Sequence, residues 1–273
     1  MATGGGSGTP DAAAPPVSGA SIDINGAKVP KEKAVVFIQF GHSNMAGRAK
    51  APASETAYHY TVQPRLWTYQ GAGKFVPAKE PTAPDNSADQ GAGPGMAWLR
   101  AAAALAGPDH HFISIARAKG SAPSTDFLKG GLYYASFADK AKELKGKVTF
   151  GGVFIMLGIT DRHLPLADQP GFTDRIARTM ADLRADLGEP NLPLLASDYE
   201  VESTGSLGVN SEIGKRLRAL VLALPAKITN CAIIPTDKIA MMDDHHFSML
   251  GHHQWSDRGV ALMKEKGWFF WGK

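Results

Sequence analysis

The stretch Val35-Val36-Phe37-Ile38-Gln39-Phe40-Gly41-His42-Ser43-Asn44-Met45-Ala46-Gly47 decides how we interpret this chain. Its first six residues are mostly apolar, β-branched or aromatic, which favours a strand buried on both faces of a parallel sheet. The run ends at Gly41, and Ser43 follows in a short polar segment. In open parallel sheets, ligands bind beyond the carboxyl ends of the strands. This position predicts that Ser43 is a nucleophile; the alternative is that its hydroxyl caps a short helix beginning at Asn44 or Met45.

Five further apolar segments alternate with segments of helical periodicity along the chain. The expected strands are residues 66–69, 111–116, 148–157, 192–196 and 231–234, and the expected helices are residues 96–106, 132–144, 172–187, 213–224 and 251–266. Strands that alternate with amphipathic helices predict right-handed crossovers and a mostly parallel sheet covered on both faces. We therefore expect an α/β fold.

The chain has 273 residues, a length that suits one large domain. Residues 1–22 are rich in Gly, Ala and Pro and contain no apolar run long enough for a signal peptide or a membrane span. We interpret them as a disordered leader and residues 23–273 as the domain. Such a tether favours an exported protein, periplasmic or extracellular, whose signal sequence has been removed; a cytoplasmic location stays open.

The charge pattern gives no indication of a nucleic-acid partner, because the net charge is only +3 and the Lys and Arg residues are spread along the chain. Arg117 and Lys119 follow the strand expected at 111–116, where they can hold an acidic sugar or a phosphate, or serve as surface charges. The single cysteine, Cys231, excludes an internal disulfide and a cysteine-based zinc site. Residues 71–95 form a long Pro- and Gly-rich stretch, which we expect to be a substrate rim.

A second polar stretch, Met241-Met242-Asp243-Asp244-His245-His246-Phe247-Ser248-Met249-Leu250-Gly251-His252-His253, places carboxylates directly before histidines. An Asp three residues before a His can accept the proton of ring Nδ1, which leaves Nε2 free to take a proton from a serine. The same histidine pairs and aspartates also suit a metal ion, although no His-Glu-x-x-His helix is present.

These two stretches resemble known blocks. The segment 41–47 is similar to the Gly-Gln-Ser-Asn-Met-x-Gly block of the sialate O-acetylesterase and acetylxylan esterase-like branch of the SGNH hydrolases. The segment 243–246, followed by Gly251, resembles the carboxy-terminal Asp-x-x-His block of that family. The segment 158–161 stands where SGNH members usually carry Gly-x-Asn-Asp.

The resemblance implies a three-layer α/β/α sandwich of the flavodoxin-like type, with a mostly parallel five-stranded sheet. It implies hydrolysis of O-acetyl or other short acyl esters on a small molecule or a polysaccharide, without a metal or other cofactor. Ser43 is then the nucleophile, His246 the general base and acid, and Asp243 the carboxylate that orients His246.

The resemblance also assigns the oxyanion hole to the backbone N–H groups of Ser43 and Gly120 and to a polar side chain after the fourth strand. The chain departs from the family here, because Leu157 and Ile159 replace polar residues and Thr160 replaces Asn. The Thr160 hydroxyl is the nearby candidate for the missing donor.

We expect four residues near these blocks to contact the substrate: His42, Asn44, Lys119 and Asp161. Two alternatives remain. One is a carbohydrate-binding protein that kept the fold and lost the chemistry, and the other is a metal-dependent hydrolase that uses the histidine pairs. The sequence does not define the oligomeric state.

Overall fold

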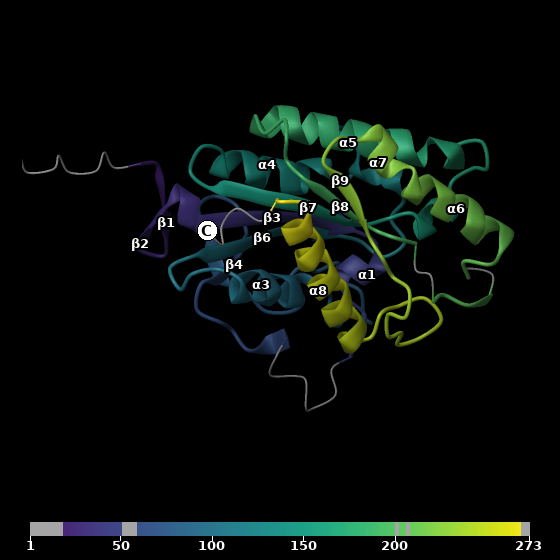
Figure 1. Cartoon of the computed structure of the whole chain (residues 1–273), viewed down its shortest axis with the longest axis horizontal. Helices are drawn as coiled ribbons and strands as arrows, with labels where there is room; N and C mark the ends of the chain where they lie inside the picture. Colours follow the sequence, from purple (N-terminus) through teal and green to yellow (C-terminus); the bar gives the residue numbers. More distant parts are fainter. Residues whose placement is uncertain (1–18, 51–58, 200–201, 206–207, 269–273) are drawn as a thin grey trace, which may run out of the picture.

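The computed structural model describes residues 19–50, 59–199, 202–205 and 208–268. Within them lies a sheet of seven strands in the order β5-β4-β6-β3-β7-β8-β9 (Figure 1). Six strands are parallel: β3 (Ala34–Gly41), β4 (Leu66–Tyr69), β6 (His111–Ala118), β7 (Thr149–Met156), β8 (Leu194–Ser197) and β9 (Cys231–Ile234). The seventh, β5 (Phe75–Pro77), pairs antiparallel with β4 at one edge.

The predicted α/β fold with a mostly parallel sheet is confirmed, but the expected number of five strands is too low. The sequence pattern itself predicted six strands, one more than the resemblance implied, and all six are present. The seventh, the edge strand β5, has three residues and lies inside the long loop 71–95. A segment this short carries no readable periodicity, so the sequence did not separate it from the loop.

Helices cover both faces of the sheet (Figure 1). One face carries α4 (Tyr134–Leu144), α5 (Phe172–Leu187), α6 (Glu212–Leu222) and α7 (Leu224–Lys227), and the other carries α1 (Ser43–Ala46), α3 (Gly95–Ala104) and α8 (Met249–Glu265). This is the predicted sandwich of three layers. A separate hairpin of β1 (Ser21–Ile24) and β2 (Ala27–Pro30) lies beside the sheet.

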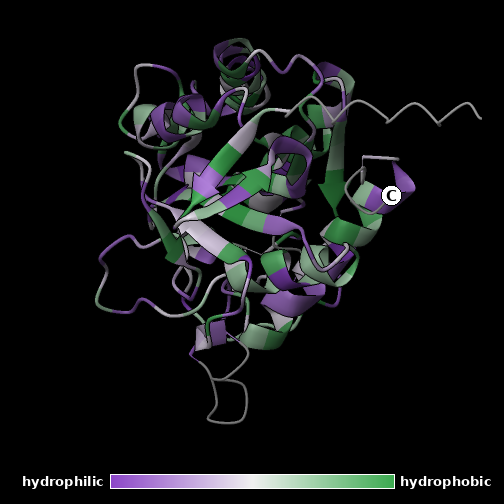
Figure 2. Ribbon diagram, turned by 90° about the vertical axis from the view of Figure 1, so that its left-hand side faces the viewer, coloured by the Kyte–Doolittle hydropathy of each residue, from purple (hydrophilic) through white to green (hydrophobic). Residues whose placement is uncertain are grey.

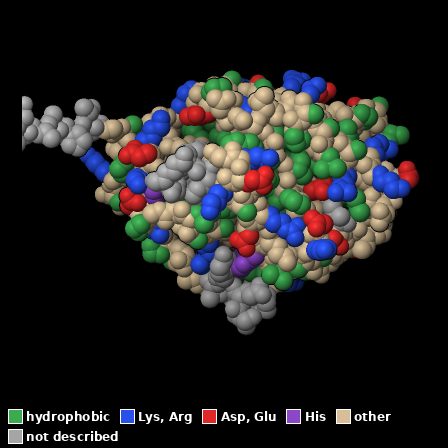
Figure 3. Space-filling model, in the orientation of Figure 1, with side chains coloured by type: hydrophobic (Ala, Val, Ile, Leu, Met, Phe, Trp, Pro, Cys, Tyr) green, Lys and Arg blue, Asp and Glu red, His purple; other side chains and the backbone are tan. Residues whose placement is uncertain are grey.

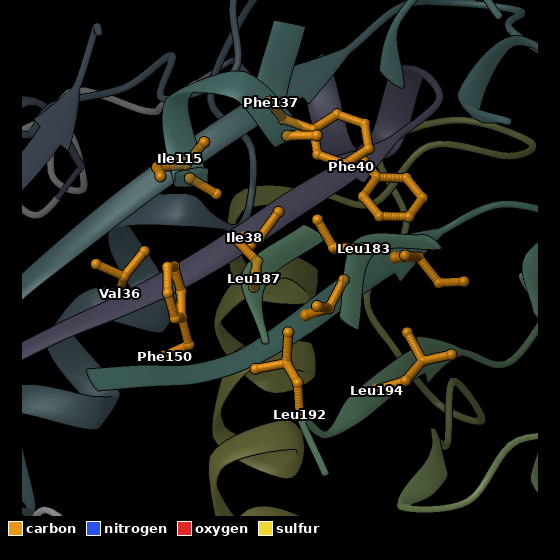
Figure 4. Packing of buried hydrophobic residues seen from close by; sticks show 14 of the residues in the cluster. Val36, Ile38, Phe40, Ile115, Phe137, Phe150, Leu183, Leu187, Leu192 and Leu194 are labelled. Carbon is orange, nitrogen blue, oxygen red and sulfur yellow. The ribbon is translucent and has the colours of Figure 1, made fainter. Parts of the chain in front are cut away.

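The central strand β3 is buried along all of its eight residues. Val36, Ile38 and Phe40 point toward α4 and α5 and join one hydrophobic cluster, in which the Phe40 and Phe137 rings stack with centroids 4.8 Å apart (Figure 4). Val35 and Phe37 alternate onto the opposite face. Burial on both faces explains why β3 has a continuous apolar sequence instead of an alternating one.

Hydrophobic and hydrophilic residues also occupy different parts of the helices, loops and surface. Hydrophobic residues concentrate in the sheet and on the helices that flank it, and hydrophilic residues are frequent in the loops (Figure 2). On the face shown in Figure 3, Lys and Arg side chains are interspersed with Asp and Glu. Among the described helices, none has both the length and the apolar character needed to cross a bilayer.

The start of the domain lies slightly earlier than the sequence indicated. Ser21 and Ile22, which we assigned to the leader, begin β1, and Ile22 is buried. Residues 1–18 lie outside the described residues.

Candidate active site

Ser43 lies at the carboxyl end of β3, where the chain turns sharply into α1. The His42 N–H donates to the carbonyl of Met156 at the end of β7, 3.0 Å away. A Cβ atom at Gly41 would lie only 2.4 Å from that same carbonyl oxygen, so glycine is required where the strand ends. The turn leaves the Ser43 side chain partly exposed at this edge of the sheet.

Three side chains predicted from the sequence meet at this edge. His246 Nε2 lies 2.9 Å from Ser43 Oγ, and His246 Nδ1 lies 2.8 Å from Asp243 Oδ2. An ionised carboxylate only accepts hydrogen bonds, so Nδ1 carries the ring proton and Nε2 accepts from the Ser43 hydroxyl. Hydrogen bonds thus connect Asp243, His246 and Ser43, although Ser43 and His246 are 203 positions apart in the sequence.

A tight turn holds the carboxylate in place. Asp243 Oδ1 accepts the backbone N–H groups of His245 and His246, at 2.9 and 2.7 Å. The turn is closed by the Met242 N–H, which donates to the His246 carbonyl at 2.8 Å. Gly251, in the first turn of α8, lets this helix approach closely, because a Cβ there would lie 2.2 Å from the Ala240 carbonyl oxygen.

The pKa values of this pair suit a base that is neutral at neutral pH. Burial lowers the pKa of His246 below its ordinary value, and the hydrogen bond to Asp243 opposes that shift only in part. Burial raises the pKa of Asp243, but the hydrogen bonds from His245 and His246 outweigh it and leave that pKa below its ordinary value. The imidazole is therefore ready to accept a proton while the carboxylate is ionised.

Asn44 connects α1 to the turn that carries His246. Its amide nitrogen donates to the carbonyl of His245 at 3.0 Å, and its amide oxygen accepts the N–H of Phe247 at 2.9 Å. The Asn44 side chain is buried, and both of these hydrogen bonds hold the turn rather than face solvent. Its two hydrogen bonds flank His246 on both sides along the chain.

The three groups expected in the oxyanion hole have different surroundings. In the described part of the chain, the Ser43 N–H has no hydrogen-bond acceptor and is available. The Gly120 N–H donates to Asp85 Oδ2 at 2.8 Å, and the buried Thr160 hydroxyl donates to the Ala122 carbonyl at 2.7 Å. A hydroxyl has one proton to donate, so in this conformation the donors of both Thr160 and Gly120 are used by other acceptors.

Asp85 forms a buried ion pair next to this edge. Its Oδ2 lies 2.7 Å from Arg48 Nη2, and both side chains are almost fully buried. Burial raises the pKa of Asp85, but the bonds from Arg48, Ser87 and Gly120 lower it well below its ordinary value. Lys119 Nζ donates to the Asp85 carbonyl at 3.2 Å.

Of the four expected substrate-contacting residues, only the Lys119 side chain is not buried. The His42 side chain is buried, and its Nδ1 caps α1 by accepting the Asn44 N–H at 3.3 Å. Asp161 is fully buried in the 3-10 segment η3 (Ile159–His163). It accepts the N–H and hydroxyl of Ser124 at 3.0 and 2.5 Å and pairs with Arg175 at 2.8 Å, so its role is structural.

The remaining acidic and histidine residues fall into two groups. Asp244 Oδ1 lies 2.5 Å from His245 Nδ1 on the exposed side of the turn. In the described ranges, Asp243, His245 and His246 offer donor atoms close enough together to hold a metal ion. His252 is instead fully buried in α8 against the Phe247 ring.

Sequence reasoning missed Glu80, which organises the loop before α3. Its carboxyl group is buried and accepts the N–H groups of Met96, Gly93 and Thr82, at 2.7, 3.1 and 3.0 Å. Burial raises the pKa of Glu80 to about 7 against the lowering effect of these bonds. A single Glu in a Pro-rich stretch gives no spacing signal that could have identified this function.

Comparisons with known proteins bear on the family and on the fold. Residues 33–263 match the family described as carbohydrate esterase, sialic acid-specific acetylesterase. A search of curated protein sequences found no match.

Solved structures share the fold. A protein from Arabidopsis thaliana has a TM-score of 0.69 and 19% identity, over 86% of this chain and 98% of its own. The protein NanS has a TM-score of 0.68 and 13% identity, over 88% of this chain and 98% of its own. A carbohydrate acetylesterase from Xanthomonas citri has a TM-score of 0.58 and 14% identity, over 85% of this chain and 56% of its own.

Proposed function

Because this chain belongs to the carbohydrate esterase family of sialic acid-specific acetylesterases, we propose that it removes acetyl groups from a carbohydrate through Ser43, His246 and Asp243. The chain is a carboxylic ester hydrolase by its family. The observation that carries the proposed mechanism is the 2.9 Å contact between His246 Nε2 and Ser43 Oγ, with Asp243 on the opposite ring nitrogen.

The proposed reaction is a double displacement. Ser43 Oγ attacks the ester carbonyl carbon while His246 Nε2 takes the hydroxyl proton. The tetrahedral intermediate then expels the sugar alkoxide, which receives the same proton from His246, and an acetyl-serine remains. Water, deprotonated by His246, attacks the acetyl carbonyl, and acetate leaves as Ser43 regains its proton.

The oxyanion of each tetrahedral intermediate needs hydrogen-bond donors. The Ser43 N–H is one donor that the observed conformation leaves available. The Gly120 N–H can become the second donor only by exchanging its bond to Asp85. Since one such donor is worth about 10²–10³ in rate, we expect modest turnover unless substrate binding brings about this exchange.

A fluorophosphonate probe tests the proposal. It should label the native protein at one site, identified as Ser43 by peptide mapping, and the labelling should be lost in Ser43→Ala and strongly slowed in His246→Ala. Labelling of another residue, or none in native protein that hydrolyses acetyl esters, contradicts the assignment.

The Gly120 N–H and the Thr160 hydroxyl already donate to Asp85 and Ala122. This favours a second candidate function, a carbohydrate-binding protein of the same fold with weakened esterase activity. It predicts binding of an acetylated sugar without release of acetate. Measuring binding and acetate release on the same substrate separates the two candidates.

A further inference from the structure

A cavity of about 730 Å³ lies at the edge of the sheet that β4 and β5 form. The strand β4 is paired with β6 only as far as Ser114, whereas β6 continues to Ala118. Ala116 and Arg117, which belong to this extension of β6, form one wall. The other walls come from α4, β5 and the loop that follows β5.

Three cationic side chains line this cavity: Lys79, Arg117 and Lys140. No carboxylate lines it, and in the described ranges none of the three forms an ion pair or a hydrogen bond. The neighbouring Glu143 carboxylate is already engaged by the Tyr69 hydroxyl and by the Ala72 N–H. The Glu143 charge therefore offsets that of Lys140 only in part, and the three cationic side chains leave the lining positively charged, which favours an anionic ligand.

The Arg117 guanidinium packs on an aromatic ring, but not all of its hydrogen-bond donors have acceptors. Its guanidinium carbon lies 4.3 Å from the centroid of the Tyr133 ring, and its Nε is buried without a partner. Burial, and after it the Arg117 charge, lower the pKa of Lys140, so these two cationic groups lie close enough to repel each other. Thr82 Oγ1, also in the lining, is a second buried polar atom without a partner.

The rest of the lining suits a sugar ring better than a bare inorganic anion. The lining combines apolar side chains, among them Val62, Val76 and Pro77, with the hydroxyl and amide groups of Thr68, Gln70 and Ser136. Sugars present apolar ring faces together with hydroxyl groups, and a binding pocket matches both with such a mixture.

The cavity opens at the same end of the sheet as Ser43. Arg117 is in register with Phe40, three residues before Ser43, and β4 lies two strands from β3 in the sheet (Figure 1). Two strand spacings correspond to about 10 Å. Pro84 lines the cavity, and the next residue, Asp85, accepts the Gly120 N–H. One loop therefore connects the cavity with the surroundings of Ser43. A ligand that occupies both must be longer than one sugar.

We propose that this cavity binds a carboxylate-bearing sugar unit that neighbours the sugar whose ester is cleaved at Ser43, with Arg117 and Lys140 holding the carboxylate. This inference rests on the proposed function. It assigns to the cavity the recognition of an acidic oligosaccharide at a distance from the reacting ester.

The test measures binding in a Ser43→Ala background, which prevents turnover. The probes are an oligosaccharide with a hexuronate unit, a sialylated oligosaccharide, and neutral oligosaccharides of equal length. We expect at least one acidic probe to bind more tightly than its neutral partner. Arg117→Gln/Lys140→Gln should weaken that binding about tenfold or more, since hydrogen bonds to charged groups are lost, and should leave neutral binding unchanged. The matched control is Lys142→Gln, a charge removal on the solvent side of the same helix.

The same charge variants are made with Ser43 intact and assayed with 4-nitrophenyl acetate, which is too small to reach the cavity. Unchanged turnover shows that they are folded, and Lys140→Gln alone replaces the pair if the double variant is unstable. Equal binding of acidic and neutral probes, or equal binding by native and variant cavities, overturns the inference. Failure of native protein to hydrolyse any acetyl ester instead contradicts the proposed function.

Discussion

The hydrogen bonds of Asn44 provide a quantitative test of how the histidine is positioned. Replacing Asn44 by Ala removes the donor to the His245 carbonyl and the acceptor for the buried Phe247 N–H. Each hydrogen bond contributes about 1 kcal/mol net, and the groups left unsatisfied add to the cost, so we expect the free energy of unfolding to fall by roughly 2–4 kcal/mol. A ring displaced by about 1 Å costs on the order of 10² in rate. We therefore predict kcat about 100-fold lower on 4-nitrophenyl acetate.

Asn44→Asp separates positioning from general stability. Its carboxylate can still accept the Phe247 N–H, but it loses the donor to His245 and adds a negative charge near the His246 ring. A nearby negative charge favours the imidazolium, so the acid limb of the pH–rate profile should move to higher pH. The control is Asn191→Ala in an exposed turn. If both Asn44 variants kept native kcat and native pH dependence while losing only stability, the positioning function would be refuted.

Further predictions concern the triad, the core and metal dependence. Asp243→Asn should lower kcat by about 10⁴, because the histidine loses its tautomer control, with the fold intact by circular dichroism. Burial lowers the pKa of His59 and of His252 to about 3, so the unfolded chain binds more protons between about pH 6.5 and pH 3. Thermal melts should therefore show stability falling as pH decreases through that window, and less so in His252→Phe. Asp161→Ala leaves Arg175 without its buried partner and should destabilise by roughly 3–5 kcal/mol in urea titrations, with near-native kcat in the folded fraction. Incubation with a chelator should leave the rate of ester hydrolysis unchanged. If the chelator abolished hydrolysis and added zinc restored it, the metal-dependent alternative would be favoured.

The part of the site that the sequence predicted depends on short-range signals. Ser43 follows the end of a continuous apolar strand, and Asp243 precedes His246 by three residues, a spacing that lets a turn fold the carboxylate back onto the ring. The structure brings these three side chains together because parallel strands align their carboxyl ends at one edge of the sheet.

The part of the site that the sequence did not predict depends on partners far away in the chain. The Gly120 N–H is taken by Asp85 and the Thr160 hydroxyl by Ala122, 35 and 38 residues away, and no local pattern reveals such pairing. The resemblance supplied positions for these donors but not their hydrogen-bond partners. The partners of Asp161 were likewise not predicted, since Ser124 and Arg175 belong to separate elements.

The most direct measurement compares initial rates of 4-nitrophenyl acetate hydrolysis by the native protein and by Ser43→Ala at equal concentration of folded protein. If Ser43 forms the acyl intermediate, its replacement lowers the rate by about 10⁴-fold or more. Equal rates for the two proteins would contradict the role of Ser43 and with it the proposed mechanism.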